Sequence, residues 1–199
     1  MHQSGAALVI ALFLLVVFSL LGTSAAQLAL QGEKAARGDR DRQIALRSAE
    51  AALRDAEIDI EHSPDAMRSR SHIFSRNAAL GFPRENESRC NAGQDNVYLG
   101  LCSLSVAGKP PWQLVNFSDR QSTSMHSVPY GHFTGRKLAT GKASLPCMLP
   151  RYVIERIVVR ALGEDAGKPA YVYRVTAIGF GVRESTQVVL QSVYRKGEA

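Results

Sequence analysis

The chain has 199 residues, 45% of them hydrophobic and 21% charged, which suits one globular domain plus one further element and excludes a disordered or collagen-like chain. Aromatic residues make up 7%, with a single tryptophan, and the net charge of +6 comes from 24 basic and 18 acidic residues mixed along the sequence. This pattern is typical of a solvated mixed surface. We therefore expect no direct binding of nucleic acid.

An uncharged segment, residues 6–30, lies near the amino terminus, and between residues 6 and 21 only Ser19 interrupts the apolar side chains. A helix needs about 20 apolar residues to span a bilayer. A cleaved secretory signal fits less well, because its apolar core has about 7–15 residues and follows basic residues. Residues 1–5 contain no lysine or arginine. The segment therefore predicts a single membrane-spanning helix.

An amphipathic helix is predicted to continue the apolar one, because no proline occurs before Pro64. Apolar residues recur there at spacings of three and four, which marks the face that packs against a sheet. These residues are Leu46, Ala49, Leu53, Ala56 and Ile60. Residues 32–39 are the weakest part of the helix, because Gly32 and Gly38 lie there. A kink or a melted turn in these residues is an open alternative.

The last third of the chain predicts an antiparallel sheet of three to four strands. Residues 62–150 are rich in turn-forming residues and are expected to form loops, apart from a first strand at 112–117. Three β-rich segments follow, separated by connections short enough for hairpins, at residues 151–160, 170–180 and 186–194. One long helix packed on this sheet gives an α+β fold.

Three cysteines, Cys90, Cys102 and Cys147, leave at least one thiol unpaired in a monomer. We prefer a Cys90–Cys102 bridge, which would fix a loop-rich segment, with either cysteine joined to Cys147 as the alternative. A disulfide implies an oxidising compartment. The basic residues after the apolar segment favour the cytoplasm for the rest of the chain instead, and we give the cysteines more weight.

The sequence contains no familiar catalytic or metal-binding motif, and we predict no enzyme activity, no cofactor and no metal. His126 and His132 lie six residues apart near Cys147, which is a weak pattern for zinc. A membrane-tethered hydrolase would need the fold to bring these histidines together with Glu155.

The order of elements resembles a type IV pilin. Two segments resemble minor pilins of the PilX type within the pilin and pseudopilin superfamily: residues 41–57 (DRQIALRSAEAALRDAE), and the closing YRVTA and VVLQSVYR. The resemblance implies that prepilin peptidase removes a leader, residues 1–5, by cutting after Gly5, so that Ala6 becomes the methylated first residue. It also implies a transmembrane and filament-core helix at 6–30 and a periplasmic head at 31–199.

Within that head the resemblance implies an amphipathic half-helix at 31–61, a loop-rich region at 62–150 and the sheet at 151–199. Two features depart from the family pattern. Family leaders usually carry lysine or arginine before the glycine, and this one does not. Major pilins carry a glutamate at the fifth mature position, where this chain has Ile10. That carboxylate meets the amino terminus of a neighbouring subunit, and a buried charge without a partner is costly. The departure therefore favours an initiating or tip position.

The function implied is that of a minor pilin that primes pilus assembly, supporting adhesion, twitching motility or DNA uptake. The partners implied are other minor pilins, the major pilin, a large tip adhesin and prepilin peptidase. The protein would be held in the inner membrane by one span, with its head in the periplasm, and would reach the cell surface in the pilus. Two alternatives stay open: a minor pseudopilin of a type II secretion system, and a signal-anchored periplasmic binding protein that does not polymerise.

Overall fold

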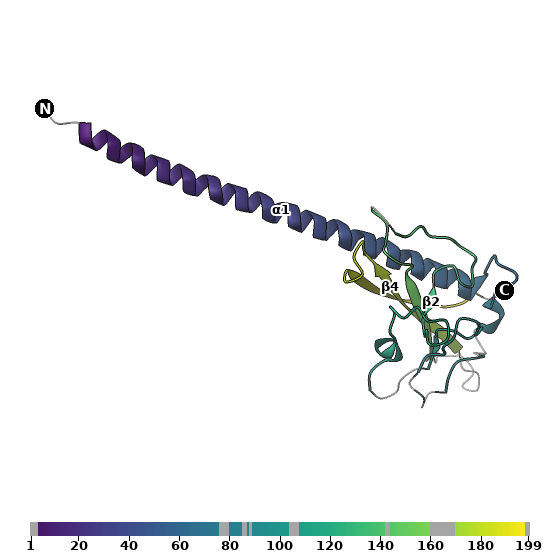
Figure 1. Cartoon of the computed structure of the whole chain (residues 1–199). Coiled ribbons are helices and arrows are strands. Elements are labelled where there is room, and N and C mark those ends of the chain that lie inside the picture. The colour runs from purple at the N-terminus through teal and green to yellow at the C-terminus, as the bar shows by residue number, and fades with distance from the viewer. Residues whose placement is uncertain are drawn as a thin grey trace. The chain divides into compact units, whose positions relative to one another are not determined.

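The computed structural model describes residues 4–75, 80–84, 87, 89–103, 108–141, 144–159 and 170–197, with side chains from residue 7 onward. The chain divides into two compact units, Met1–Arg40 and Asp41–Ala199. Helix α1 (Ser4–Glu61) contributes to both (Figure 1). Each unit is described separately below.

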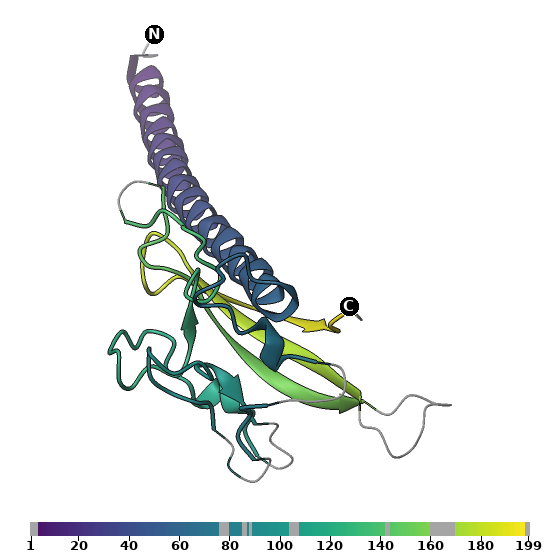
Figure 2. The ribbon, with the colours of Figure 1, turned by 90° about the vertical axis from the view of Figure 1, so that its right-hand side faces the viewer.

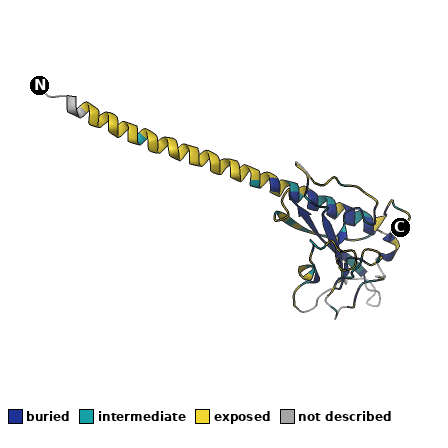
Figure 3. Ribbon diagram, in the orientation of Figure 1, coloured by how far each residue is buried: buried dark blue, intermediate teal, exposed yellow. Residues whose placement is uncertain are grey.

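The first unit is the amino-terminal part of α1. Its described side chains are exposed except at Val17 and Gly38, which are intermediate, and Figure 3 shows this part almost entirely in yellow. Apart from Val17, the described large apolar side chains are between 46% (Leu14) and 70% (Leu8) exposed. The helix runs without interruption through residues 32–39, so no melted turn occurs at Gly32 or Gly38. Strong helix formers, Ala35 and Ala36 among them, lie between these glycines and favour the helix.

The second unit combines the rest of α1 with one sheet. Strands β3 (Arg151–Val159), β4 (Ala170–Phe180) and β5 (Gln187–Tyr194) form an antiparallel meander in which β4 is central. Two short strands join at β3: β1 (Leu101–Cys102) pairs parallel to it, and β2 (Val128–Pro129) pairs antiparallel. The α+β architecture is confirmed.

The sheet differs from the prediction in two details. In the described part of the chain it has five strands and is mixed, because β1 and β2 join the three long antiparallel strands and β1 pairs parallel to β3. Two-residue strands are too short to show an alternating pattern in sequence. The strand expected at 112–117 is instead a 3₁₀ helix, Pro111–Leu114. Proline fixes its own φ near the helical value and suits the first helical position, so Pro111 favours this turn.

Helix α1 covers one face of the sheet (Figure 2), and loop residues pack on part of the other face. On the helix side the core contains Ala52, Ala56 and Ile60 with Tyr152 and Tyr173. On the opposite side, Phe117 and Met148 from the loops pack with strand residues such as Val153, Ile178 and Phe180. The second unit therefore has three layers: the helix, the sheet and a region of loops.

The helix packs closely because its buried face is built from alanines. Ala45, Ala49, Ala52 and Ala56 are 0% exposed. Opposite them Gly179 of β4 has no side chain, and a Cβ there would overlap the backbone of Ala45 and Ala49. Of the residues predicted to pack on the sheet, Ala49, Ala56 and Ile60 are buried, whereas Leu46 and Leu53 are only half-buried. The buried face is therefore rotated away from Leu46 and Leu53.

Candidate functional site

The apolar part of α1 is suited to a membrane or to a bundle of similar helices. Its most apolar 18-residue window has a mean hydropathy of 2.6, and none of that window is buried within the chain. The hydroxyls of Thr23 and Ser24 donate to the carbonyl oxygen of Leu20, at 3.0 and 2.8 Å, so these polar groups are satisfied inside the helix. Backbone and side-chain polar groups bonded within one helix are what an apolar surrounding requires.

Asp41, the first residue of the second unit, holds the loop between β4 and β5. Its carboxylate accepts hydrogen bonds from the backbone N–H of Val182 (2.5 Å), the hydroxyl of Thr186 (2.6 Å) and Nε of Arg183 (3.1 Å). Burial alone would raise the pKa of Asp41, but the hydrogen bonds from these three residues outweigh it and lower the pKa. The ionised carboxylate therefore fastens the hairpin to the helix.

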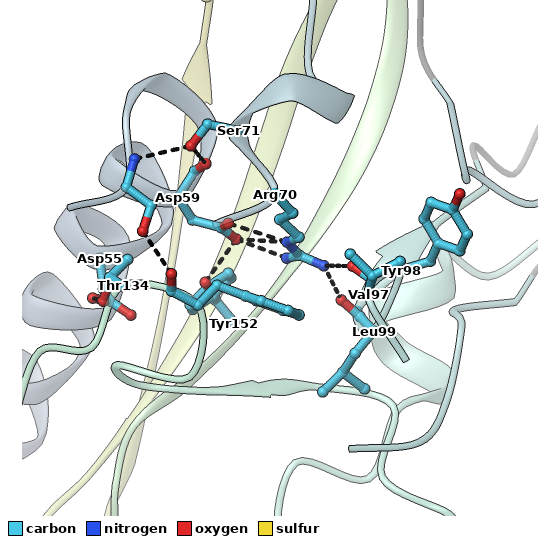
Figure 4. A network of polar contacts seen from close by, with 12 residues as sticks. Asp55, Asp59, Arg70, Ser71, Val97, Tyr98, Leu99, Thr134 and Tyr152 are labelled. Atoms are coloured by element: carbon cyan, nitrogen blue, oxygen red, sulfur yellow. Dashed lines mark hydrogen bonds and ion pairs between the residues drawn. The ribbon is translucent and has the colours of Figure 1, made fainter. Parts of the chain in front are cut away.

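Asp59 and Arg70 form a buried ion pair near the carboxyl end of α1 (Figure 4). Both side chains are 0% exposed, and Nη2 of Arg70 lies 2.7 Å from Oδ2 of Asp59, with Nε at 3.0 Å from the same oxygen. Tyr152 of β3 donates its hydroxyl to Asp59 at 2.9 Å. The pair therefore links the helix, the segment that follows it, and the sheet.

Arg70 also ties a second loop into this network. Its Nη1 donates to the carbonyl oxygens of Val97 (3.0 Å) and Leu99 (2.7 Å), and its guanidinium carbon lies 3.7 Å from the ring centroid of Phe133. A planar guanidinium with several fixed donors suits this combination of carboxylate, carbonyl and aromatic contacts. Arg70 therefore connects helix α1 to two loops inside the head.

Asp55, one turn before Asp59, holds the loop after β2. It accepts hydrogen bonds from the backbone N–H of Gly131 (2.7 Å) and the hydroxyl of Thr134 (2.5 Å). Burial raises the pKa of Asp55 despite these bonds, and the nearby charge of Asp59 raises it further. At the end of the helix, Glu61 accepts the hydroxyl of Tyr194 at 2.9 Å. Four carboxylates of α1 therefore fix four separate segments of the head.

A disulfide joins Cys90 to Cys102, as expected, and it ties the segment before β1 to that strand. The third cysteine, Cys147, is unpaired and intermediate in exposure. Burial raises the pKa of the Cys147 thiol, so it stays protonated near neutral pH. A protonated, partly covered thiol is a weak nucleophile.

The three residues considered for hydrolysis lie in different surroundings. Glu155 is 0% exposed and is bound by Arg174 at 2.8 and 2.9 Å. His126 Nδ1 lies 2.9 Å from the carbonyl oxygen of Cys90, and the ring of His132 packs on Phe133. Burial lowers the pKa of His132, and the charge of Arg70 lowers it further. Among the described residues, no three metal-ligating side chains come close enough to hold an ion.

Comparison with models of protein families identifies the family of this chain. Residues 86–196, more than half of the chain, match the family model of the type IV pilus assembly protein PilX, carboxyl-terminal part, and residues 4–54 match the PilX amino-terminal model. The chain belongs to the PilX family. Comparison with curated proteins and with solved structures gave no significant match.

Membership of the PilX family makes the chain a minor pilin of type IV pilus assembly, a structural class of protein that acts together with other pilus components. The amino-terminal PilX model covers the apolar segment and the helix as far as Arg54. The carboxyl-terminal model covers the disulfide and all five strands. The PilX-type resemblance and the pilin-like α+β fold are confirmed.

The buried charges of this PilX-family head were missed by the sequence analysis, which named only apolar residues on the packing face of the helix. Asp55 and Asp59 are four residues apart, and Asp41 precedes Asp59 by 18 residues, which is five turns of an α-helix. All three therefore share the face of the buried alanines. That coincidence of acidic and apolar positions was the available signal.

Proposed function

We propose that this minor pilin primes assembly of a type IV pilus and occupies a position at or near the pilus tip. The observation that carries the proposal is Ile10, an apolar side chain 59% exposed on the helix surface, at the fifth position after Gly5. A filament subunit with a carboxylate at this position can neutralise the amino terminus of its neighbour inside an apolar core. A subunit without it gains nothing from that ion pair, and the end of the filament is where no such pair is needed.

In this proposal prepilin peptidase cuts after Gly5, and Ala6 becomes the methylated amino terminus. The helix first lies in the inner membrane and later packs among other pilin helices. Both surroundings are apolar, which suits a segment whose described side chains expose apolar groups on all sides. The Cys90–Cys102 disulfide supports a periplasmic head.

The head would contact other minor pilins, the major pilin and a large tip adhesin, and the pilus would serve attachment, twitching motility or DNA uptake. The rigid framework of the head supports such a role. Carboxylates from one helix hold the β4–β5 loop, the loop after β2 and the end of β5, so the outer surfaces keep a fixed geometry. Preorganised surfaces lose less conformational entropy when subunits associate.

The decisive experiment measures the intact mass of the protein in sheared pili. We expect a mass that lacks residues 1–5, carries a methyl group and shows one disulfide. Recovery of the full-length chain in the membrane fraction alone, in cells with active prepilin peptidase, would contradict the proposal and favour an anchored protein that does not polymerise.

A second experiment tests the tip position with Ile10→Glu. If the missing carboxylate excludes the subunit from the shaft, the variant should appear along the pilus when labelled with antibody, whereas wild type should label the ends. Ile10→Leu is the matched control and should keep the wild-type pattern. An unchanged pattern for Ile10→Glu would show that another feature sets the position.

A further inference from the structure

Strand β5 forms an open edge of the sheet. The strand order is β1-β3-β4-β5, and in the described part of the chain no strand pairs with the outer side of β5. Alternate residues of the strand are exposed, and Val189 and Val193 are 43% and 64% exposed. These valines lie on the sheet face away from α1, and the loop layer leaves them uncovered. An apolar edge of this kind is suited to pairing with another chain.

The register shows which backbone groups point outward. The N–H of Gly181 donates to the carbonyl oxygen of Thr186 at 2.8 Å, so these two residues form a hydrogen-bonded pair at the start of the hairpin. Hydrogen-bonded pairs alternate along an antiparallel ladder. With Gly179 opposite Val188, the even-numbered residues of β5 bond to β4. The N–H and C=O groups of residues 187, 189, 191 and 193 therefore face the open edge.

The helix side of this edge is also apolar. Leu46 and Leu53 are seven residues apart, and Glu61 follows Leu53 by eight, so all three lie on one side of α1. Glu61 accepts a hydrogen bond from Tyr194, which places that side next to β5. Leu46 and Leu53 are half-buried, as are Val188 and Leu190 of the strand. An added strand would therefore find apolar side chains on both of its faces.

The edge is held at both ends and carries none of the usual protections. Asp41 fixes the loop before β5, and Glu61 fixes the segment after it through Tyr194 and the N–H of Gly197. Between these two points β5 has no proline, no charged residue and no bulge, since its pairing with β4 is continuous. Proteins usually block a free edge with one of these features.

We propose that the β5 edge binds an extended segment of a different protein as an added antiparallel strand. The segment should alternate apolar with polar side chains, and it should carry an acidic residue near its amino-terminal end. That end lies beside the exposed Arg195, which directly follows β5. Main-chain hydrogen bonds would supply affinity and the side chains selectivity. This docking surface goes beyond tip position and priming and does not depend on either.

The geometry argues against antiparallel pairing with the β5 strand of a second copy of this chain. Asp41 contacts the start of β5 and Glu61 its end, so α1 and β5 run in the same direction. Two β5 strands paired antiparallel would reverse the two helices, with their Asp41 ends at opposite ends of the dimer. Two chains anchored in one membrane enter their heads from the same side, so this pairing is unavailable to them.

The first test measures amide hydrogen exchange of the full chain in detergent micelles, alone and with a synthetic peptide, Asp-Val-Thr-Val-Thr-Val-Thr-Val. In the free protein, the amides of Val189, Gln191 and Val193 should exchange at least about tenfold faster than those of Val188 and Leu190. The peptide should slow the outward-facing amides about tenfold, as expected for new ladder bonds. The same peptide with proline at alternate positions should have no effect.

Variants locate the effect on the edge. Val193→Lys and Gln191→Pro should abolish protection by the peptide, the first by placing a charge beside the added strand and the second by removing an outward N–H. Val158→Lys is the matched control, because Val158 is 39% exposed but lies on β3, away from the edge. Melting temperature measured for each variant separates loss of docking from loss of folding.

Four results would overturn the proposal. They are slow exchange of the outward amides in the free chain, no protection by the peptide, equal loss of protection in Val158→Lys, and a disulfide-linked dimer formed by Gln191→Cys in a Cys147→Ser background. The last result would identify a second copy as the occupant. All four concern the head alone, so they leave the test of tip position by Ile10→Glu unaffected.

Discussion

The two parts of helix α1 have the same backbone geometry but require different surroundings. Residues 6–30 carry no charge and expose apolar side chains, so this part needs an apolar surrounding outside the chain. From Asp41 onward the helix presents alanines to the sheet and places three aspartates on the same buried face. The comparison shows that buried charge is tolerated where the chain itself provides every partner, and that the first part excludes charge because it provides none.

Removing the carboxylate of Asp59 should have the largest effect on the stability of the head. Asp59→Ala leaves the guanidinium of Arg70 buried without its counter-ion, which should lower the free energy of unfolding by about 3–5 kcal/mol. Denaturant titration of the full chain in micelles measures this loss. The double variant Asp59→Leu with Arg70→Met should lose less than Asp59→Ala alone. An equal or larger loss would show that the pair matters for reasons other than an uncompensated charge.

A charge in the first part of the helix should have a different effect. Leu14→Lys places an ammonium within the apolar segment, which should cost about 2.5–3.5 kcal/mol in membrane insertion. The unfolding midpoint of the head should stay unchanged, because Leu14 belongs to the first unit. Carbonate extraction measures insertion, and Leu14→Phe is the matched control. A head destabilised by Leu14→Lys would contradict the separation of the two parts.

Breaking the disulfide should cost about 2–4 kcal/mol, since it closes a segment with little core of its own. Cys102→Ser and reduction with dithiothreitol should shift the denaturation midpoint by the same amount. Cys147→Ser should change it little, because Cys147 is unpaired. Mass spectrometry of the oxidised chain should find the bridge between Cys90 and Cys102 only.

Acid should weaken the head in two separate pH ranges. Burial lowers the pKa of His132 from its ordinary 6.5, so the unfolded chain binds a proton more readily than the folded one. The contribution of His132 to the free energy of unfolding is therefore fully present above pH 6.5 and decreases as the pH drops below that value. Hydrogen bonds lower the pKa of Asp41 from 3.8, so its contribution is lost only below that pH. His132→Gln should flatten the first range, and Asp41→Asn the second. Denaturation midpoints across pH check both, and a common response to either variant would contradict these assignments.

The smallest effect is expected at the surface of the helix. Arg47 and Glu50 form an ion pair at 3.1 Å, with the arginine side chain 77% exposed. Glu50→Ala should change the free energy of unfolding by no more than about 0.5 kcal/mol, because solvent and ions screen such a pair. A loss comparable to that of Asp59→Ala would show that exposure does not govern the value of these charges.

The sequence predicted the long periodic elements of the fold and missed the features that depend on tertiary contacts. Helix α1 and strands β3, β4 and β5 extend over enough residues for their periodicity to appear. Strands β1 and β2 have two residues each and exist because β3 provides partners. The 3₁₀ helix at Pro111–Leu114 replaced a predicted strand because prolines fixed the local backbone.

The candidate site was predictable in the same uneven way. Cysteine spacing suggested the bridge between Cys90 and Cys102, and the structure forms it. The packing face was only partly predicted. Leucine is more apolar than alanine, so the sequence pattern favoured Leu46 and Leu53, whereas the helix approaches Gly179 of the sheet closely through the backbone of its alanines. The roles of Asp41 and Asp59 depend on Thr186 and Tyr152, which lie 145 and 93 residues away in the sequence. Local patterns carry no information about such partners.

The hydrogen bonds of Asp41 have a consequence for the order of biosynthesis. Thr186, one of its partners, follows it by 145 residues, so the ribosome makes the anchor helix long before the hairpin that secures the head to it. The head can therefore fold completely only after nearly the whole polypeptide has been translated. Late folding of this kind lengthens the time during which unpaired strands are exposed, and it gives chaperones a defined interval in which to act.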